Sequence, residues 1–316
     1  MRRMPATHDK TAAGDDPRYA TAASNIRHEA LIIGVMLTGS TLWGLYWLPL
    51  RWLEQAGLGG LWALTLIYVG ATLTLGVAAR RHLRLARAAR RRLLGIALSA
   101  AVSGIAFGLG MIEGEVARVL ILFYLSPVWA VLLARMLLGE RLLAVTVPAL
   151  VLALFGAGLM LLSDAPAAGG AGGFLAGFGM ADLLGLVAGL AFALTNVQLR
   201  AARGLPAELR NLAAVALAPP LAGLAALGTG ADFSAAPSAI LAALGVGLVW
   251  MSGMISATQF GIARLPLQRS SVLLLFELIV GAVSAALLAG ESLRLAELSG
   301  GACIVIAGLA VVWFRH

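Results

Sequence analysis

The sequence predicts an all-α polytopic membrane protein with ten transmembrane helices, built as two inverted five-helix repeats with both termini in the cytoplasm. Three observations predict this fold: the composition, ten apolar segments of membrane-spanning length, and an internal repeat shifted by 151 residues. The 316 residues are 60% hydrophobic and only 12% charged, whereas soluble domains carry roughly 25% charged residues. The longest polar stretch is the N-terminal tail, so we expect no large soluble domain and no ATPase subunit.

Apolar segments of about 20 residues have the length that a transmembrane helix needs. The ten predicted spans are 30–50, 58–79, 93–112, 116–137, 143–162, 181–199, 209–227, 239–263, 267–289 and 295–314. A segment rich in Gly and Ala separates the first five spans from the last five. We therefore divide the chain into a disordered cytoplasmic tail (1–28), a first repeat (29–163), a periplasmic linker (164–180) and a second repeat (181–316).

The basic residues predict the orientation of these spans. With the N-terminus inside, 20 of the 23 Lys and Arg residues fall on the cytoplasmic side, seven of them between the second and third spans. Cytoplasmic loops of membrane proteins carry such an excess. The net charge of +8 is thereby explained without a nucleic-acid partner. We expect the lipid bilayer and a small-molecule substrate as partners.

The internal repeat predicts an inverted architecture. A shift of 151 residues superimposes three landmarks, and a shift of 149 superimposes five more. These pairs are Arg118 with Arg269, Gly139 with Gly290, Glu140 with Glu291, Trp43 with Phe192, Gly44 with Ala193, Arg51 with Arg200, Ser103 with Ser252 and Gly104 with Gly253. Because each repeat has five spans, an odd number, the two copies insert in opposite senses, which puts Glu140 on the inner side and Glu291 on the outer side. Inverted repeats of this kind support alternating access to a site near the bilayer midplane.

The segment that opens at Tyr124 carries a family resemblance. The residues Tyr124 to Val128 and Leu138 to Arg141 resemble the EamA repeat of the drug/metabolite transporter superfamily, which has five helices per repeat. In the second half, Gly290 and Glu291, Gly300 to Ala302 and Gly308 match the same pattern. The resemblance covers the chain from about residue 30 and implies export of small metabolites. Length and the aromatic-rich first span are similar to the YddG-like exporters of aromatic and other amino acids.

Among the fifteen acidic residues, only Glu277 lies deep in a predicted span. Ten residues into the span, it is roughly 15 Å from the inner boundary at 1.5 Å per residue. An unpaired carboxylate at this depth costs several kcal/mol and is protonated, paired or close to water. Two interpretations stay open: Glu277 holds a substrate ammonium or a coupling proton, or it is a structural carboxyl bonded to a neighbouring helix.

Aromatic residues at comparable depth in several spans predict a cavity that stacks flat or apolar side chains. They are Trp43, Tyr46, Tyr68, Phe107, Tyr124, Phe192, Trp250 and Phe276. The three-and-four spacing places Trp43, Tyr46 and Leu50 on one helical face. The amides of Asn196 and Gln259 are further candidates for contact with substrate. Packing between helices is the alternative for all of them.

Proline and arginine residues are the candidates for hinges and gates. Pro127, Pro219 and Pro220 interrupt the backbone hydrogen bonds of predicted spans, and such breaks mark binding sites and hinges in transporters. Arg118 and Arg269 begin corresponding helices at opposite membrane faces. They either bind a carboxylate at a gate or extend to lipid phosphates.

Several function classes are excluded by what the sequence lacks. All four histidines lie in tails or loops, and the sequence contains no GxxxxGK[ST] phosphate loop and no HExxH motif. We therefore expect no enzyme, no metal site and no cofactor. The prediction is a secondary transporter of the bacterial inner membrane that exports amino acids by alternating access. A drug, sugar or other metabolite carrier and a passive channel are the alternatives, and proton coupling stays open.

Overall fold

The computed structural model describes residues 17–139, 146–162, 178–265, 273–274, 276–291 and 294–313. Within these ranges the chain is helical and contains no β-strand. The first half contains α1 (Pro17–Gly44), α2 (Trp47–Gln55), α3 (Gly60–Ala79), η1 (Arg80–His82), α4 (Leu83–Ala88), α5 (Arg90–Glu113), α6 (Val116–Phe123), α7 (Ser126–Leu138) and α8 (Thr146–Leu162). The second half contains α10 (Met180–Ala201), α11 (Ala207–Ala216), α12 (Ala218–Gly228), α13 (Pro237–Gly245), η2 (Val246–Met251), α14 (Ser252–Ile262), α16 (Phe276–Leu288) and α17 (Leu295–Trp313).

Seven helical stretches in the described residues are long and apolar enough to cross a membrane. They are His28–Gln55, Gly60–Ala88, Arg90–Glu113, Val116–Leu137, Met180–Ala201, Ala207–Gly228 and Pro237–Ile262. Three shorter apolar helices, Val147–Gly156, Phe276–Leu288 and Leu298–Ala307, lie within the three remaining predicted spans. The chain is therefore a multi-pass membrane protein, and the count of ten spans stays a prediction.

The first helix begins earlier than the sequence predicts. Residues 17–28 of the predicted disordered tail belong to α1, which starts at Pro17. Proline is favoured at the first position of a helix because its missing N–H has no intrahelical partner there. The residues that follow are rich in alanine, the strongest helix former. A polar segment thus continues the first apolar helix at its N-terminal end.

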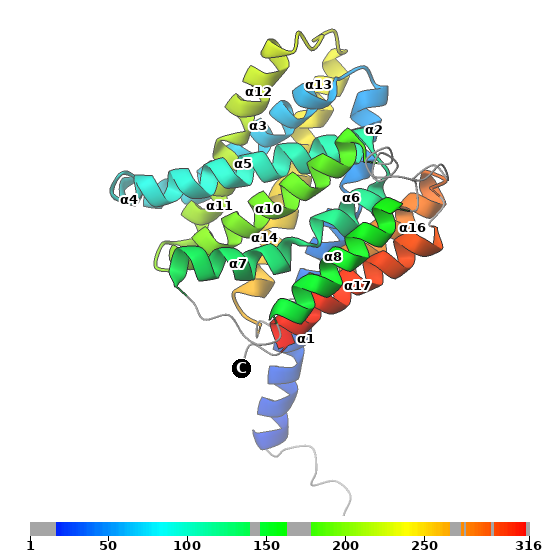
Figure 1. Cartoon of the computed structure of the whole chain (residues 1–316). Helices are drawn as coiled ribbons and strands as arrows, with labels where there is room; N and C mark the ends of the chain where they lie inside the picture. Colours follow the sequence, from blue (N-terminus) through cyan, green and yellow to red (C-terminus); the bar gives the residue numbers. More distant parts are fainter. Residues whose placement is uncertain are drawn as a thin grey trace, which may run out of the picture.

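The main packing pairs join the first half of the chain to the second. Helix α10 packs along α5, and α17 packs along α8 (Figure 1). Helix α1 packs against α14 and α16, while α3 packs against both α11 and α12. The largest hydrophobic core runs through these contacts and contains buried residues of both halves. The two halves therefore form one core rather than two separate bundles.

Four of the seven membrane-length stretches are interrupted near their middle. The breaks fall between α1 and α2, between α6 and α7, between α11 and α12, and at the π-helical segment η2. The first three breaks each precede a proline, which lacks an N–H and clashes with the carbonyl four residues back. These prolines are Pro49, Pro127 and the pair Pro219 and Pro220. The predicted breaks at Pro127 and at Pro219 and Pro220 are confirmed, whereas the break before Pro49 was missed.

Candidate functional site

Tyr124 and Glu277 bring two helix ends together. Tyr124 is the residue at which α6 ends, and Glu277 lies in the first turn of α16 with 7% of its surface exposed. The Tyr124 hydroxyl lies 2.8 Å from the carbonyl oxygen of Leu274 and 3.3 Å from Oε2 of Glu277. The predicted deep carboxyl therefore has a neighbour on another helix, and this neighbour is itself a predicted site residue.

The geometry at Tyr124 ties its hydrogen bonding to the protonation of Glu277. A phenol has one hydrogen to donate, but the Tyr124 hydroxyl has two oxygen neighbours. When the hydroxyl donates to Leu274, a protonated Glu277 can donate to the Tyr124 oxygen and satisfy all three groups. When Glu277 is ionised, the Tyr124 hydroxyl can donate its hydrogen to the carboxylate only if it no longer donates to the Leu274 carbonyl.

An aromatic cluster adjoins Tyr124. The ring of Phe123 lies 4.8 Å from Phe107, 5.0 Å from Phe192 and 5.9 Å from Tyr124, measured between centroids. Trp43 continues the cluster, with its ring 6.4 Å from Phe107. Four helices, α1, α5, α6 and α10, thus contribute one ring or more to a continuous aromatic layer. The sequence predicted every member except Phe123, which lies in an unbroken apolar run.

Tyr46 extends this layer at the break between α1 and α2. Its ring lies 6.2 Å from Trp43 in an edge-on arrangement. The sequence placed Trp43, Tyr46 and Leu50 on one face of a continuous helix, but the chain is interrupted at Leu45 and Tyr46. Tyr46 and Leu50 are nevertheless both buried, and Tyr46 contacts Trp43, because the chain resumes as a helix immediately after the break.

Two buried hydroxyl groups of the first predicted span have no hydrogen-bond partner among the described residues. They belong to Tyr46, 1% exposed, and Ser40, fully buried. Tyr68 on α3 is also buried, with 4% of its surface exposed. Gly104 leaves the room that the Tyr68 hydroxyl occupies, since a Cβ there would collide with it. A buried polar group without a partner costs about 1–3 kcal/mol, and the described residues do not offset this cost at Tyr46 or Ser40.

Trp250 has a structural partner at the α1 break. Its indole N–H donates to the carbonyl of Leu42 over 2.9 Å. In an uninterrupted helix this carbonyl would accept from Tyr46, whose N–H bonds instead to Trp43 over 3.1 Å. Trp250 therefore satisfies a carbonyl that the break leaves without its helical partner. Gly44 adds to this junction by letting the backbone of α1 approach the Glu277 carbonyl, 2.6 Å from where a Cβ would stand.

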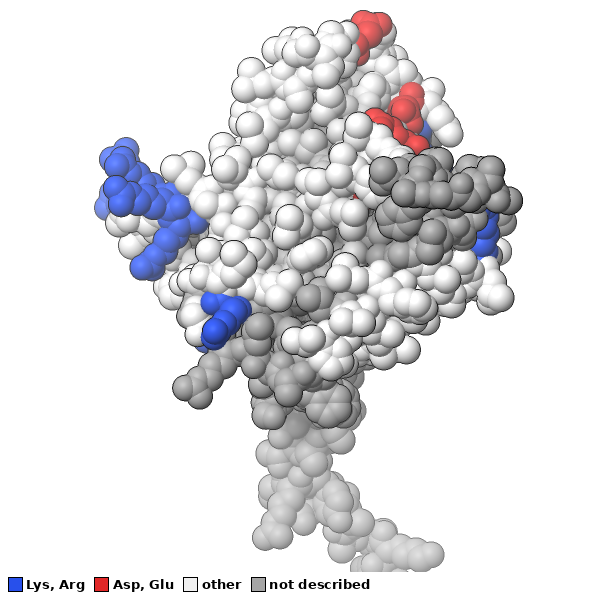
Figure 2. All heavy atoms as spheres, in the orientation of Figure 1, with Lys and Arg blue, Asp and Glu red and all other residues white. Residues whose placement is uncertain are grey.

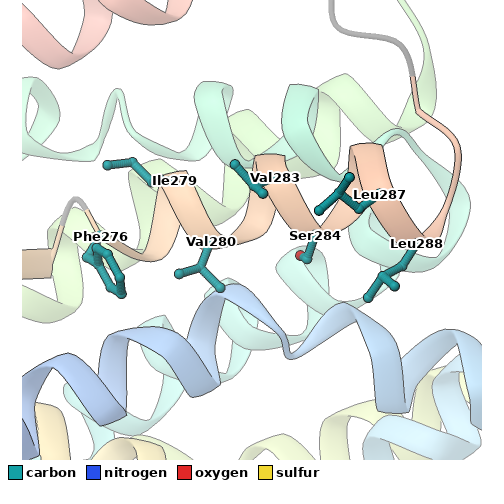
Figure 3. Close-up of a pocket in the computed structure, with 7 residues that line it drawn as sticks. All are labelled: Phe276, Ile279, Val280, Val283, Ser284, Leu287 and Leu288. Carbon is teal, nitrogen blue, oxygen red and sulfur yellow. The ribbon is translucent and has the colours of Figure 1, made fainter.

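The remaining predicted residues lie outside the aromatic layer. Asn196 is exposed on α10, Gln259 is half-buried on α14, and Phe276 is 37% exposed. Phe276 lines an apolar groove of about 320 Å³ on α16 (Figure 3). The residues that line this groove are Phe276, Ile279, Val280, Val283, Ser284, Leu287 and Leu288.

Figure 3 shows that Phe276, Val280, Ser284 and Leu288 point from α16 toward the N-terminal helices. The Ser284 hydroxyl accepts a hydrogen bond from the indole of Trp47 over 3.0 Å. The groove has little polar surface and lies on a helix with largely exposed leucines. Its almost entirely apolar lining does not suit a charged or strongly polar ligand.

An ion pair closes the junction of α2, α6 and α16. Nη2 of Arg51 lies 3.0 Å from Oε1 of Glu291. The same nitrogen donates to the carbonyl of Gly114 over 2.6 Å, and Nε of Arg51 donates to the carbonyl of Met111 over 3.1 Å. The Glu291 carboxylate also accepts from the backbone N–H of Val116 over 3.2 Å. It therefore stands at the N-terminus of α6, where the helix dipole favours a negative charge.

A second ion pair lies two residues further along α6. Arg118 and Asp182 form a bidentate pair, with 2.5 Å between Nε and Oδ1 and 2.9 Å between Nη2 and Oδ2. Both residues are buried, at 8% and 4% exposed. The expectation that Arg118 extends to lipid phosphates is thus wrong, because Asp182 on α10 supplies an internal partner. Asp182 was not predicted, and Arg269, the counterpart of Arg118, lies outside the described residues.

The chain resembles a transporter sequence and a solved structure, but no family model matches it. The chain is 28% identical over 229 residues to an uncharacterized transporter of Archaeoglobus fulgidus, an alignment that covers 71% of this chain and 76% of the relative. A crystal structure whose description names no function resembles it with a TM-score of 0.58 at 16% identity, covering 90% of this chain and 99% of the other. The chain is therefore an all-helical multi-pass membrane protein with a known fold and with sequence similarity to an uncharacterized transporter.

Proposed function

We propose that the protein is a secondary transporter of the drug/metabolite transporter type, which exports amino acids, including aromatic ones, across the bacterial inner membrane by alternating access. Similarity to an uncharacterized transporter supports the general class. The contact between Tyr124 and Glu277, at two helix ends beside an aromatic layer, is the observation that carries the proposal.

The packing of helices that correspond in the two halves supports two inverted repeats. In the proposed register, α1 corresponds to α10 and α14 corresponds to α5. The pair of α1 with α14 then becomes the pair of α10 with α5, and both pairs pack closely. Helices α8 and α17 are each other's counterparts and also pack together. Gly139 and Gly290, which the register pairs, both follow the end of a helix with a positive φ.

The proposed substrate site has a different group for each part of an amino acid. Glu277 faces the ammonium group, and the rings of Trp43, Phe107 and Phe123 take a flat or apolar side chain. The hydroxyl groups of Tyr46 and Tyr68 can donate to the carboxylate. Aromatic pairs of this kind stabilise a stacked ring by about 0.5–1.5 kcal/mol beyond area burial. No Lys or Arg occurs in the middle of a predicted span, which disfavours phosphate-bearing substrates.

The proposed gate uses the pair of Arg51 and Glu291. In the predicted orientation this pair closes the outer end of the site by tying α2 to the start of α6. The repeat register assigns Arg200 and Glu140 as its counterpart on the inner side. We infer that the outer pair holds in the inward-facing state and that the inner pair holds in the outward-facing state. Glu140 lies outside the described residues.

Counterflow in proteoliposomes tests the proposal. Liposomes that contain the purified protein are loaded with unlabelled phenylalanine, and entry of labelled L-phenylalanine and D-phenylalanine is compared. We expect saturable entry that favours the L-isomer, at least tenfold lower in Glu277→Gln. The matched control is Phe276→Leu at the adjacent, groove-lining position, which should transport like the wild type.

Other results of the counterflow experiment would each reject a different part of the proposal. Linear, unsaturable flux would identify a channel instead of a carrier. Unchanged transport by Glu277→Gln would remove Glu277 from the site. Saturable transport of other metabolites, with none of amino acids, would leave the carrier in place and reject the substrate class.

A further inference from the structure

We propose that the segment joining α3 to α5 is a binding surface for anionic phospholipid headgroups. This segment and the first turn of α5 together carry seven arginines, and all of them are exposed: Arg80, Arg81, Arg84, Arg87, Arg90, Arg91 and Arg92. The chain contains no acidic residue between Glu54 and Glu113. In Figure 2 the basic side chains gather at the edge of the molecule where Figure 1 shows α4. The surface is therefore strongly positive, without acids of its own segment to neutralise it.

The position of this arginine surface selects a lipid as its partner. It lies at the adjoining ends of two helical stretches long and apolar enough to cross a membrane, Gly60–Ala88 and Arg90–Glu113. A short connection between two spans stays at the level of the lipid headgroups. Clusters of four to eight basic residues directly beside a transmembrane helix bind anionic headgroups. A soluble acidic protein would have to compete with the high local density of lipid phosphates.

Apolar side chains of the same segment favour insertion among lipids. Leu83 is 47% exposed, Leu85 49% and Leu94 55%. A short segment with exposed leucines between arginines can place the leucines below the headgroups while the guanidinium groups reach the phosphates. Guanidinium groups bind phosphate oxygens in a bidentate manner, which an ammonium group cannot do. The leucines would thus contact the lipid below its headgroup, while the arginines bind its phosphate.

Among the described residues, no acidic side chain forms an ion pair with the seven arginines. Among the described residues, the ion pair of this segment joins His82 to Glu208 on α11, at 4.0 Å. Both side chains of that pair are at least a third exposed. The seven guanidinium groups make no ion pair with an acid in the described part of the chain. Within the described residues, these guanidinium groups are therefore available to a ligand of opposite charge.

Lipid retention by the purified protein tests this proposal. The protein is incubated in detergent with equal amounts of cardiolipin, phosphatidylglycerol and phosphatidylcholine, and the retained lipids are counted by native mass spectrometry. We expect the wild type to retain either anionic lipid at least tenfold more than phosphatidylcholine. The quadruple variant Arg84→Gln, Arg87→Gln, Arg90→Gln and Arg91→Gln should lose at least four fifths of this retention.

Matched variants separate charge, geometry and folding. Lysine at the same four positions keeps the charge and should retain more lipid than the glutamine variant. Glutamine at Arg203 and Arg264, two exposed arginines on other elements, should retain lipid like the wild type. If the glutamine quadruple does not elute as a folded protein, a salt titration of the wild type replaces it, with release of the lipid expected between 0.1 and 0.5 M NaCl because exposed charges are screened.

Three results would overturn the proposal. The first is equal retention of phosphatidylcholine and anionic lipids by the wild type. The second is full retention of cardiolipin by a folded glutamine quadruple, or by the wild type at 0.5 M NaCl. The third is complete displacement of lipid by glycerol 3-phosphate at the same concentration, which would identify a site for free phosphate compounds. None of these results depends on transport activity.

Discussion

The hydroxyl of Tyr124 lies 3.3 Å from the Glu277 carboxylate, although 153 residues separate the two in the chain. Both residues stand at helix ends, and both are buried. Glu277 belongs to the second half of the chain and Tyr124 to the first, so this contact lies where the halves meet. It makes the protonation of one buried carboxyl sensitive to a hydroxyl of the other half.

Removal of the Tyr124 hydroxyl should destabilise the protein through both of its oxygen neighbours. Tyr124→Phe leaves the Leu274 carbonyl and Glu277 without this partner, and we expect a loss of about 1–3 kcal/mol in the free energy of unfolding. Thermal unfolding in detergent measures the change. In a Glu277→Gln background the same substitution should cost a different amount, because the two residues are coupled. Equal costs in both backgrounds would show that the contact has no energetic role.

Substitution of Glu277 should remove a pH response of transport. If Glu277 binds and releases a proton in each cycle, a pH gradient across proteoliposomes accelerates net export by the wild type. Glu277→Gln cannot titrate, so the transport that remains in this variant should no longer respond to the gradient. Measurement of labelled phenylalanine efflux at several pH gradients checks this. A wild type that ignores the gradient would contradict proton coupling and favour facilitated export.

The buried pair of Arg118 and Asp182 should show strong non-additivity. Arg118→Leu leaves an unpaired carboxylate in the core, and we expect a cost of about 3–5 kcal/mol, as for other broken buried pairs. The double variant Arg118→Leu with Asp182→Leu removes both charges and should be more stable than the single variant. Thermal unfolding of the wild type, the single variant and the double variant measures these differences in stability. A double variant that is less stable than Arg118→Leu would contradict the pairing.

Trp250 should stabilise the break between α1 and α2. Trp250→Phe keeps an aromatic ring but leaves the Leu42 carbonyl without a donor, so we expect a loss of about 1–3 kcal/mol. Trp52→Phe is the matched control, because Trp52 is 53% exposed and near the same break. The control should change the midpoint of thermal unfolding little. Similar losses in both variants would mean that the indole hydrogen bond to Leu42 contributes nothing specific.

The parts of the fold that depend on local sequence were predictable. Composition and segment length indicate membrane helices because the lipid core requires about 20 apolar residues for each span. The breaks before Pro127 and Pro219 follow from the missing proline N–H. The same rule applies to Pro49, whose break was overlooked because the aromatic residues around it were interpreted as one continuous helical face.

The parts that depend on long-range pairing were not predictable from one sequence. Asp182 lies 64 residues from Arg118, and no local pattern links the two. The indole of Trp250 and the carbonyl of Leu42 are 208 residues apart, and the carbonyl becomes available only because the helix breaks. Phe123 was missed because it lies within a continuous apolar run and carries no polar group. The contacts of Asp182, Trp250 and Phe123 all depend on how the two halves of the chain pack against each other.

Alternating access by inverted repeats requires the two halves of the chain to have opposite orientations in the membrane. Cys303 is the only cysteine, so a Cys303→Ala background lets single cysteines report their side of the bilayer. Cysteines replace Glu140 and Ala289, with Arg84 and Phe233 as references for the two sides, and intact cells are treated with a membrane-impermeant maleimide. We predict that positions 289 and 233 react in intact cells and that 140 and 84 react only after permeabilisation. Reaction of positions 140 and 289 from the same side would contradict the inverted repeat and the alternating-access mechanism built on it.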